Sequence, residues 1–116
     1  MSTSVLIVDD HPSFRASARR MLEASGYAVV GEAADGAAAI AAARELDPDL
    51  VLLDVQLPDI DGFEVAERLA LGSAPDVVLT SSRDSADFGT AIAESPARGF
   101  IAKAELSGAT LAELVE

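Results

Sequence analysis

Five short apolar runs, rich in valine, leucine and isoleucine, constrain the fold of this chain more than any other feature. The runs are VLIV at 5–8, YAVVG at 27–31, LVLLD at 50–54, DVVLT at 76–80 and GFIAK at 99–103. They lack the alternation of apolar and polar residues that marks a strand with one face in water. We therefore expect five buried strands in a sheet that is covered on both faces.

Stretches with helical periodicity separate these runs and follow the last one. Apolar residues share one helix face in five groups: Phe14, Ala18, Met21 and Leu22; Ala37, Ile40 and Ala41; Phe63, Ala66 and Ala70; Phe88, Ala91 and Ile92; Leu111, Leu114 and Val115. Strands that alternate with helices predict parallel strands joined by right-handed crossovers. The sequence thus predicts an α/β fold of the (βα)5 type, a doubly wound five-stranded parallel sheet, forming one domain over residues 1–116. Ser107 is a plausible N-cap for the last helix.

The composition limits the classes of protein to which the chain can belong. Half of the 116 residues are hydrophobic and there is no cysteine, so one apolar core is expected and disulfides and thiolate metal sites are excluded. No apolar run approaches the roughly 18 residues that a membrane helix needs. The opening MSTSVLIVDD has no basic region before a long apolar core, so we expect no signal peptide and a cytoplasmic location.

The charge is strongly acidic, with 20 acidic against 8 basic residues and a formal net charge of −12. Such a chain repels a phosphate backbone, so we expect no nucleic-acid binding through this segment. His11 is the only histidine and Lys103 the only lysine. A single histidine argues against a histidine-based zinc site, and only Lys103 can supply a compact ammonium group.

Polar side chains stand where the predicted strands end. Asp9 and Asp10 follow the first strand, Asp54 ends the third, Thr80 ends the fourth and Lys103 ends the fifth. Ligands of open α/β sheets bind outside the carboxyl ends of the strands. We therefore expect three carboxylates, a hydroxyl and an ammonium group to converge at one edge of the sheet.

Three carboxylates that lie together repel one another unless a cation sits among them. Oxygen ligands without histidine or cysteine suit a hard ion, most simply Mg2+. A carboxylate beside Mg2+, a hydroxyl and a lysine is typical of a phosphoryl-transfer site. In such a site the carboxylate oxygen attacks phosphorus, and the other groups hold the equatorial oxygens.

Four motifs in this order resemble the receiver domain of bacterial two-component response regulators. They are VDD at 8–10, the D-x-x-x-P-x-x-x-G pattern of 54–62, the apolar run that ends in Thr80, and GFIAK at 99–103. The resemblance covers essentially the whole chain. It implies a flavodoxin-like strand order 2-1-3-4-5 and a phosphorelay switch that accepts a phosphoryl group from a sensor histidine kinase.

The resemblance also implies a role for each site residue. Asp54 is then the phosphoacceptor, and Asp9 and Asp10 bind Mg2+ together with Asp54 and the backbone carbonyl of Gln56. Thr80 and Lys103 contact the phosphoryl oxygens, and Phe100 falls at the aromatic switch position of the family. Signalling, and a homodimer, would use the surface of the fourth helix, the fifth strand and the fifth helix.

The segments VDDHPSFR and RGFIAKAEL are similar to the branch that usually carries a C-terminal helix-turn-helix domain for transcription regulation. We expect no such domain within this chain. Ala104 stands where most receivers have proline after the lysine, so we expect a trans peptide bond or a local rearrangement there. The segment ESPAR at 94–98 stands where small residues are usual, which makes the loop between the fourth helix and the fifth strand a point of difference.

Other interpretations of the same residues stay open from sequence alone. Asp9 and Asp10 can cap the first helix, Thr80 can be an ordinary strand residue and Phe100 a core residue. His11 is interpreted as a loop residue or a contact at the start of the first helix, and not as a proton shuttle. A degenerate receiver would be an interaction module that needs no phosphorylation. A phosphatase of the haloacid dehalogenase type needs a second acid two residues after its nucleophile, where this chain has Gln56.

Overall fold

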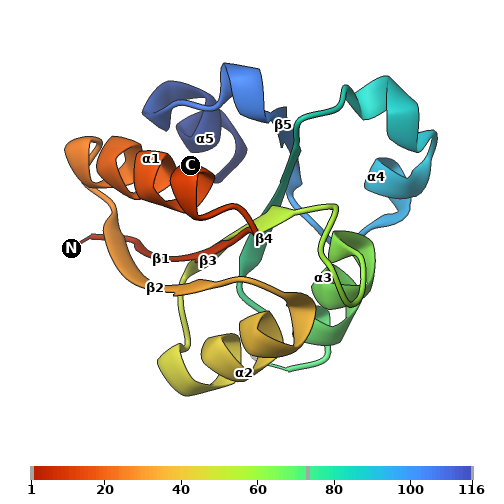
Figure 1. The fold of residues 1–116 in the computed structure, drawn as a ribbon, viewed down its shortest axis with the longest axis horizontal. Coiled ribbons are helices and arrows are strands. Elements are labelled where there is room, and N and C mark those ends of the chain that lie inside the picture. The colour runs from red at the N-terminus through yellow and green to blue at the C-terminus, as the bar shows by residue number, and fades with distance from the viewer. Residues whose placement is uncertain (1, 73, 116) are drawn as a thin grey trace.

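A five-stranded parallel sheet forms the centre of the molecule (Figure 1). The computed structural model describes residues 2–72 and 74–115. The strands are β1 (Ser4–Val8), β2 (Ala28–Ala33), β3 (Leu50–Asp54), β4 (Asp76–Ser81) and β5 (Gly99–Ala102). Their order is β2-β1-β3-β4-β5, and all pairs are parallel. The predicted fold class and strand order are confirmed.

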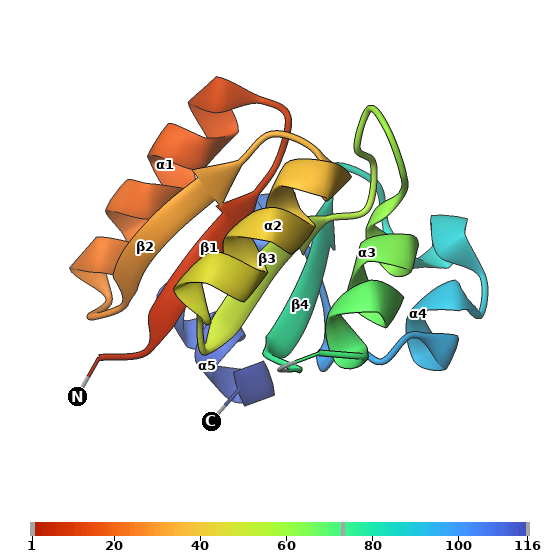
Figure 2. The ribbon, with the colours of Figure 1, turned by 90° about the horizontal axis from the view of Figure 1, so that it is seen from below.

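Helices cover both faces of this sheet, as both views show (Figure 1, Figure 2). The α-helices are α1 (Pro12–Ala24), α2 (Gly36–Leu46), α3 (Gly62–Ala70), α4 (Ala91–Glu94) and α5 (Gly108–Val115), and two short 3-10 helices are η1 (Ser85–Phe88) and η2 (Lys103–Glu105). Helices α1 and α5 lie on one face, and α2 and α3 on the other. No helix within the described ranges combines the length and the apolar character that crossing a bilayer requires.

Two apolar cores follow from the strand pattern, one for each face. Alternate residues of a strand point to opposite faces, so Val5 and Ile7 of β1 pack with α1 and α5, whereas Leu6 and Val8 pack with α2 and α3. All four side chains are fully buried. Burial on both faces explains why the strands read as continuous apolar runs.

Short polar side chains begin several helices at the edge where the strands end. The carboxylates of Asp35 and Asp61 accept hydrogen bonds from the backbone N–H groups of Ala38 and Glu64 in the first turns of α2 and α3. The hydroxyl of Ser107 accepts one from Thr110 N–H, which confirms Ser107 as the N-cap of α5. These caps satisfy N–H groups that a helix leaves without partners.

The fourth helical region differs from the expectation of a single face shared by Phe88, Ala91 and Ile92. The chain forms η1, turns at Gly89 with φ of 58° and ψ of −127°, and then completes only one turn of α4. That backbone conformation is open to glycine because it has no Cβ. Ser95 is extended, as the residue before Pro96 tends to be, and this ends the helix.

Two smaller differences concern strand boundaries. The second strand begins one residue later than the predicted run and continues to Ala33. Lys103 is the first residue of η2, so it follows β5 instead of ending it. The chain has no cis peptide bond in the part that the structure describes, and the bond before Ala104 is trans as expected.

Candidate functional site

The carboxyl ends of β1, β3, β4 and β5 bring the predicted site residues to one edge of the sheet. Asp9 follows β1, Asp54 ends β3, and Thr80 is the register partner of Asp54 on β4. Asp9 and Thr80 have no exposed surface and Asp54 is 3% exposed. Buried charges occur in proteins when they are paired or hold an ion, so this edge is the candidate site.

Lys103 holds the two buried carboxylates together. Its Nζ atom is 2.6 Å from Asp9 Oδ2 and 3.3 Å from Asp54 Oδ2. The same ammonium lies 4.3 Å from the centre of the Phe14 ring, on α1. The ring face favours the positive charge and shields one side of the ion pair from water. The predicted convergence of Asp9, Asp54 and Lys103 is therefore present.

The two buried carboxyl groups are shifted in opposite directions. Burial is the largest influence on Asp54 and raises its pKa; the nearby charge of Asp9 raises it too, while Gln56 N–H and Lys103 only partly offset this. Burial alone would also raise the pKa of Asp9, but hydrogen bonds from Lys103 and from His11 N–H hold it below its ordinary value. Asp54 is thus the carboxylate whose negative charge is least compensated.

The side chain of Lys103 itself stays positively charged. Burial, its largest influence, would lower its pKa, yet the two carboxylates that face it leave the pKa above the ordinary value. The ammonium group is therefore charged at any physiological pH. It can transfer its hydrogen bond from Asp54 to another anion at the same place.

Asp10 and His11 form the open side of the site. Their side chains are 36% and 66% exposed, and His11 Nδ1 lies 3.1 Å from both Asp9 Oδ1 and Asp10 Oδ1. The backbone N–H of His11 also donates to Asp9 Oδ1, at 2.8 Å. The sequence interpretation of His11 as a loop residue or a contact at the helix start agrees with its N-cap position on α1, but it does not include this contact with both carboxylates.

The chemistry of this cluster fits a divalent cation. One ligand atom from each of Asp9, Asp10, His11 and Asp54 lies within 4.8 Å of the others. Three carboxylates so close together repel one another, and the raised pKa of Asp54 reflects part of that repulsion. Hard oxygen donors are the ligands that Mg2+ prefers, so the predicted Mg2+ ligands Asp9, Asp10 and Asp54 suit the ion.

Thr80 supplies a second sign that this edge receives a ligand. Its side chain is fully buried, and its Oγ1 atom has no hydrogen-bond partner among the residues at 2–72 and 74–115. An unsatisfied buried hydroxyl costs about 1–3 kcal/mol. A group that accepts its hydrogen bond beside Asp54 would remove this cost.

The loop behind Asp54 is held close by a glycine. Gly62 N–H donates to Val55 O at 2.7 Å, and a Cβ at Gly62 would collide with the backbone carbonyl of Asp54. Only glycine allows α3 to begin this near the end of β3. The loop also carries Gln56, whose N–H donates to Asp54 Oδ1 at 3.1 Å. The role of the Gln56 carbonyl as an Mg2+ ligand stays a prediction.

Arg15 anchors the β1 end of the site from α1. Its Nη1 atom donates to the backbone carbonyl of Asp9 at 2.6 Å, and its Nε atom donates to Glu32 Oε1 at 3.0 Å. Arg19 donates to the other oxygen of Glu32 at 2.8 Å. No sequence motif pointed to this support, because it joins β1, α1 and β2 only in the folded chain.

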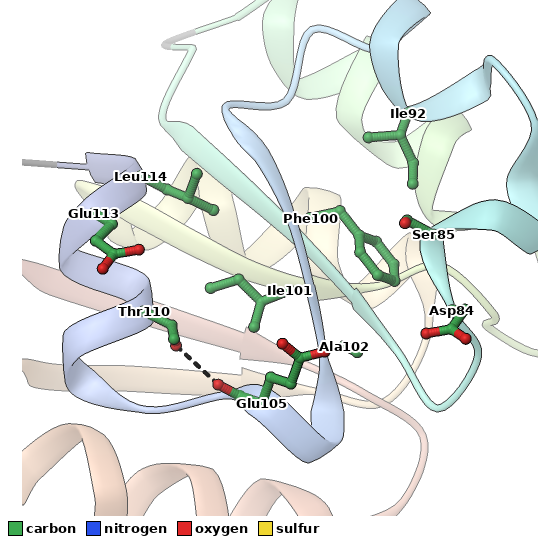
Figure 3. A pocket seen from close by; sticks show the side chains of 10 residues that line it. All are labelled: Asp84, Ser85, Ile92, Phe100, Ile101, Ala102, Glu105, Thr110, Glu113 and Leu114. Atoms are coloured by element: carbon green, nitrogen blue, oxygen red, sulfur yellow. Dashed lines mark hydrogen bonds between the residues drawn. The ribbon is translucent and has the colours of Figure 1, made fainter.

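Phe100 packs in a line of aromatic rings on the α3 side of the sheet. Its ring centre is 5.8 Å from that of Phe88, which in turn is 5.9 Å from that of Phe63 in an edge-to-face contact. Phe100 also lines a cavity of about 490 Å³ between η1, β5 and α5 (Figure 3). It is partly buried. Its position is compatible with a core residue and with a ring that changes position.

Comparison with known proteins agrees with this geometry. Residues 5–116 match the response regulator receiver domain family. The chain belongs to this family. It is 43% identical to response regulator GacA of Pseudomonas syringae pv. syringae over 115 residues, and 42% identical to GacA of Pseudomonas viridiflava over the same length. Each match covers 97% of this chain and 51% of the relative, so this receiver domain spans about half the length of these relatives.

A solved structure shows the same arrangement. A two-component response regulator of the LuxR family from Aurantimonas sp. SI85-9A1 superposes with a TM-score of 0.85 at 33% identity. The match covers 99% of this chain and 86% of that one. Neither the matched family nor these relatives support a phosphatase or a degenerate interaction module. The chain is a receiver domain of the two-component response regulators.

Proposed function

We propose that Asp54 of this receiver accepts a phosphoryl group from a phosphohistidine of a sensor histidine kinase. The observation that carries the proposal is the buried Asp54 carboxylate, with its raised pKa, between the unpartnered hydroxyl of Thr80 and the ammonium of Lys103. A carboxylate oxygen forms the new bond to phosphorus as the bond from phosphorus to the histidine nitrogen breaks. The displaced imidazole keeps the electron pair of that bond.

Three side chains of this chain act on the transferred group. Lys103 donates a hydrogen bond to a phosphoryl oxygen in place of Asp54 Oδ2, while its pairing with Asp9 holds it in position. Thr80 donates its free hydroxyl to a second oxygen. Lys103 already contacts Asp54, and Thr80 is the register partner of Asp54 on β4, so we expect only local movements of these two donors to accompany the transfer of charge.

Asp9, Asp10 and Asp54, with the backbone carbonyl of Gln56, are the proposed ligands of Mg2+. The bound ion supplies positive charge that offsets the repulsion between the carboxylates and the incoming phosphoryl oxygens. Asp9 offers only Oδ1 for this purpose, because Oδ2 is paired with Lys103. Asp10 is the more exposed ligand, with a side chain that is 36% exposed, and its Oδ1 atom lies 3.1 Å from His11 Nδ1.

The proposed output surface is formed by α4, β5 and α5, and it contains a cavity that η1 also lines. Figure 3 shows Ile92, Phe100 and Leu114 around a cavity whose rim carries the carboxylates of Asp84, Glu105 and Glu113. A change in the position of Phe100 would alter the shape of this cavity. We propose that this surface, made of α4, β5 and α5, forms a homodimer or contacts an output partner.

The same reasoning makes the chain a regulator and not an enzyme that acts on outside substrates. Gln56 stands where a phosphatase of the Asp-nucleophile class needs a general acid, and an amide cannot transfer a proton. We also propose a cytoplasmic location, where a kinase would meet it. With a net charge of −12, this segment itself is proposed not to bind nucleic acid, so transcription control would come from another part of the full protein.

Acetyl phosphate and Mg2+ test the central assignment. The intact mass of the wild-type chain should increase by one phosphoryl group, and Asp54→Asn should show no increase. Asp47→Asn is a matched control, because Asp47 is exposed, and asparagine tolerates its left-handed backbone with φ of 45°. Labelling of the Asp54→Asn chain at the wild-type level contradicts the proposal.

A further inference from the structure

We propose that His11 is a nitrogen ligand of the divalent cation, so that the site favours first-row transition ions such as Mn2+ and Co2+ over Mg2+. The inference rests on the proposed function, because it concerns the ion that accompanies phosphoryl transfer to Asp54. It gives a role to His11, which does not lie at the end of a strand and is not among the predicted metal ligands.

The positions of the ligand atoms carry the proposal. His11 Nδ1 is 3.1 Å from Asp9 Oδ1 and 3.1 Å from Asp10 Oδ1, and the four ligand atoms, including one from Asp54, lie within 4.8 Å of one another. An octahedral ion with bonds of 2.0–2.1 Å separates neighbouring ligands by about 2.9 Å and opposite ones by about 4.2 Å. The nitrogen therefore stands at the distance of a neighbouring ligand from both carboxylates.

The backbone directs the imidazole toward the carboxylates. His11 is extended, with φ of −96° and ψ of 109°, as expected for the residue before Pro12. Its N–H is held by Asp9 Oδ1 at 2.8 Å, and α1 begins at the next residue. The ring is thus attached to a fixed point of the chain beside the carboxylates of Asp9 and Asp10.

The ligand types explain the preference among ions. Carboxylate oxygens alone suit Mg2+ and Mn2+, whereas an imidazole nitrogen adds affinity for later first-row ions, in the order Mn2+ then Co2+. Neutral imidazole can bind through Nδ1 while its other nitrogen keeps the proton. The exposed His11 and Asp10 side chains leave this side open for water or a phosphoryl oxygen to complete the ligand shell.

The composition gives this proposal an unusually direct test. His11 is the only histidine of the chain, so any imidazole nitrogen coupled to bound Mn2+ in an untagged sample belongs to it. Pulsed electron paramagnetic resonance of the Mn2+-loaded wild-type chain should show this coupling. His11→Asn and His11→Ala should lose it. A saturated wild-type sample without the coupling overturns the inference, and so does a coupling that persists in both variants.

Affinities provide a second, independent measurement. We expect His11→Asn to weaken Co2+ binding by roughly tenfold in calorimetric titration, with a smaller loss for Mn2+ and the smallest for Mg2+. Asparagine is a good N-cap residue, so this variant preserves the start of α1, and His11→Ala checks that the amide does not replace the ligand. Equal losses for the three ions, or tighter Mg2+ binding because His11 had competed with the cation, overturn the inference.

The two proposals fail in distinguishable ways. A chain that is phosphorylated at Asp54 but shows no nitrogen coupling contradicts the role of His11 alone. A chain that shows the coupling but is not labelled at Asp54 contradicts the proposed function and leaves His11 as a metal ligand.

Discussion

Asp9 follows β1 and Asp54 ends the neighbouring strand β3, and both contact Lys103, yet their pKa values are shifted in opposite directions. Asp9 is closer to Lys103, at 2.6 Å against 3.3 Å, and it also accepts the N–H of His11. Its pKa falls, while burial and the charge of Asp9 raise that of Asp54. In the metal-free protein the ionised form of Asp54, the residue that we propose as the phosphoacceptor, is therefore unfavourable.

This difference predicts opposite effects of two isosteric variants on the metal-free protein. A pKa that is raised on folding means that ionised Asp54 destabilises the fold once the pH rises above that pKa. Asp54→Asn should therefore increase the free energy of unfolding at pH 7 by on the order of 1 kcal/mol. The gain should disappear as the pH falls and Asp54 becomes protonated in both states. Urea unfolding in the presence of a chelator, repeated between neutral and acidic pH, measures it.

Asp9→Asn is the matched control. The pKa of Asp9 is lowered on folding, so its contribution to stability is present above the unfolded-state pKa and is lost as the pH falls through the folded-state value. This variant should destabilise the protein at pH 7. If Asp9→Asn and Asp54→Asn changed the free energy of unfolding at pH 7 equally, the unfavourable charge would not be specific to Asp54.

The sequence predicts the site residues that lie in a strand or within two residues of its end, and it misses those that lie farther along the chain. Asp54 and Thr80 belong to strands and Asp9 follows one directly, so the topology alone brings them together. His11 and Arg15 reach the same place through the exit angle of β1 and the start of α1. Local pattern does not encode that angle, so the sequence analysis missed both contacts.

At the scale of elements, the loop between β3 and α3 is fastened to the start of α2. The carboxylate of Asp59 accepts the N–H of Gly36 at 2.7 Å and the N–H of Ala37 at 2.9 Å. A Cβ at Gly36 would collide with Ile60, so the loop also packs against the helix at this point. This loop starts directly after Asp54 and carries Gln56. Asp59 thus connects α2 to the candidate site.

The hydrogen bonds from α2 predict a distinct pH dependence for this link. The N–H groups of Gly36 and Ala37 lower the pKa of Asp59 to about 2. Asp59 therefore stabilises the fold above its unfolded-state pKa, and this contribution is lost as the pH falls toward about 2. Asp59→Asn should be less stable than wild type at pH 7, and the two should converge in acid. Thermal unfolding from pH 7 to pH 2 measures the difference.

Asp61→Asn is the control, because Asp61 caps only its own helix, α3. Asparagine is as good an N-cap as aspartate, so this variant should change stability little across the same pH range. An Asp59→Asn chain that stays as stable as wild type at pH 7 would show that the contacts with α2 do not hold the loop.

The fourth helix shows where element prediction from pattern fails. Phe88 and Ile92 have helical spacing, but Gly89 and Pro96 lie close enough to interrupt or end the segment. Helical periodicity records only the spacing of apolar residues. It does not show that one glycine can turn the chain and leave only a single helical turn after it. The remaining helices begin at residues with clear capping or N1 preferences, and their existence was predicted correctly.

At the scale of the molecule, the parallel sheet explains why one edge holds the whole candidate site. All five strands run in the same direction, so every carboxyl end meets the same solvent-facing edge. The alternation of strands and helices predicts this much. The strand order was predicted only from the family resemblance, because the apolar runs alone do not indicate which strands are neighbours.

Strands β4 and β5 connect the site to the proposed output surface. Thr80 and Asp54 lie at the edge, whereas Phe100 lies on the α3 side and pairs with Leu79 of β4, one residue from Thr80. If Thr80 moves toward a phosphoryl oxygen, the backbone of β4 and the contacts of Phe100 must respond. Charge-assisted hydrogen bonds to the phosphoryl group would favour the new packing, with a typical coupling of about 1–3 kcal/mol.

This coupling predicts how amide NMR spectra respond to beryllofluoride, a mimic of the phosphoryl group, in the presence of Mg2+. The wild-type chain should show large shifts around Phe100 and the cavity beside it. Thr80→Ala combined with Lys103→Ala should still bind Mg2+ through its carboxylates, but the shifts around Phe100 should be much smaller, because both donors to the mimic are gone. Thr3→Ala, at the opposite end of the sheet, is the control and should respond as wild type does. A double variant whose Phe100 region shifts as much as in wild type, with the mimic bound in both, would show that the change reaches this surface without Thr80 and Lys103.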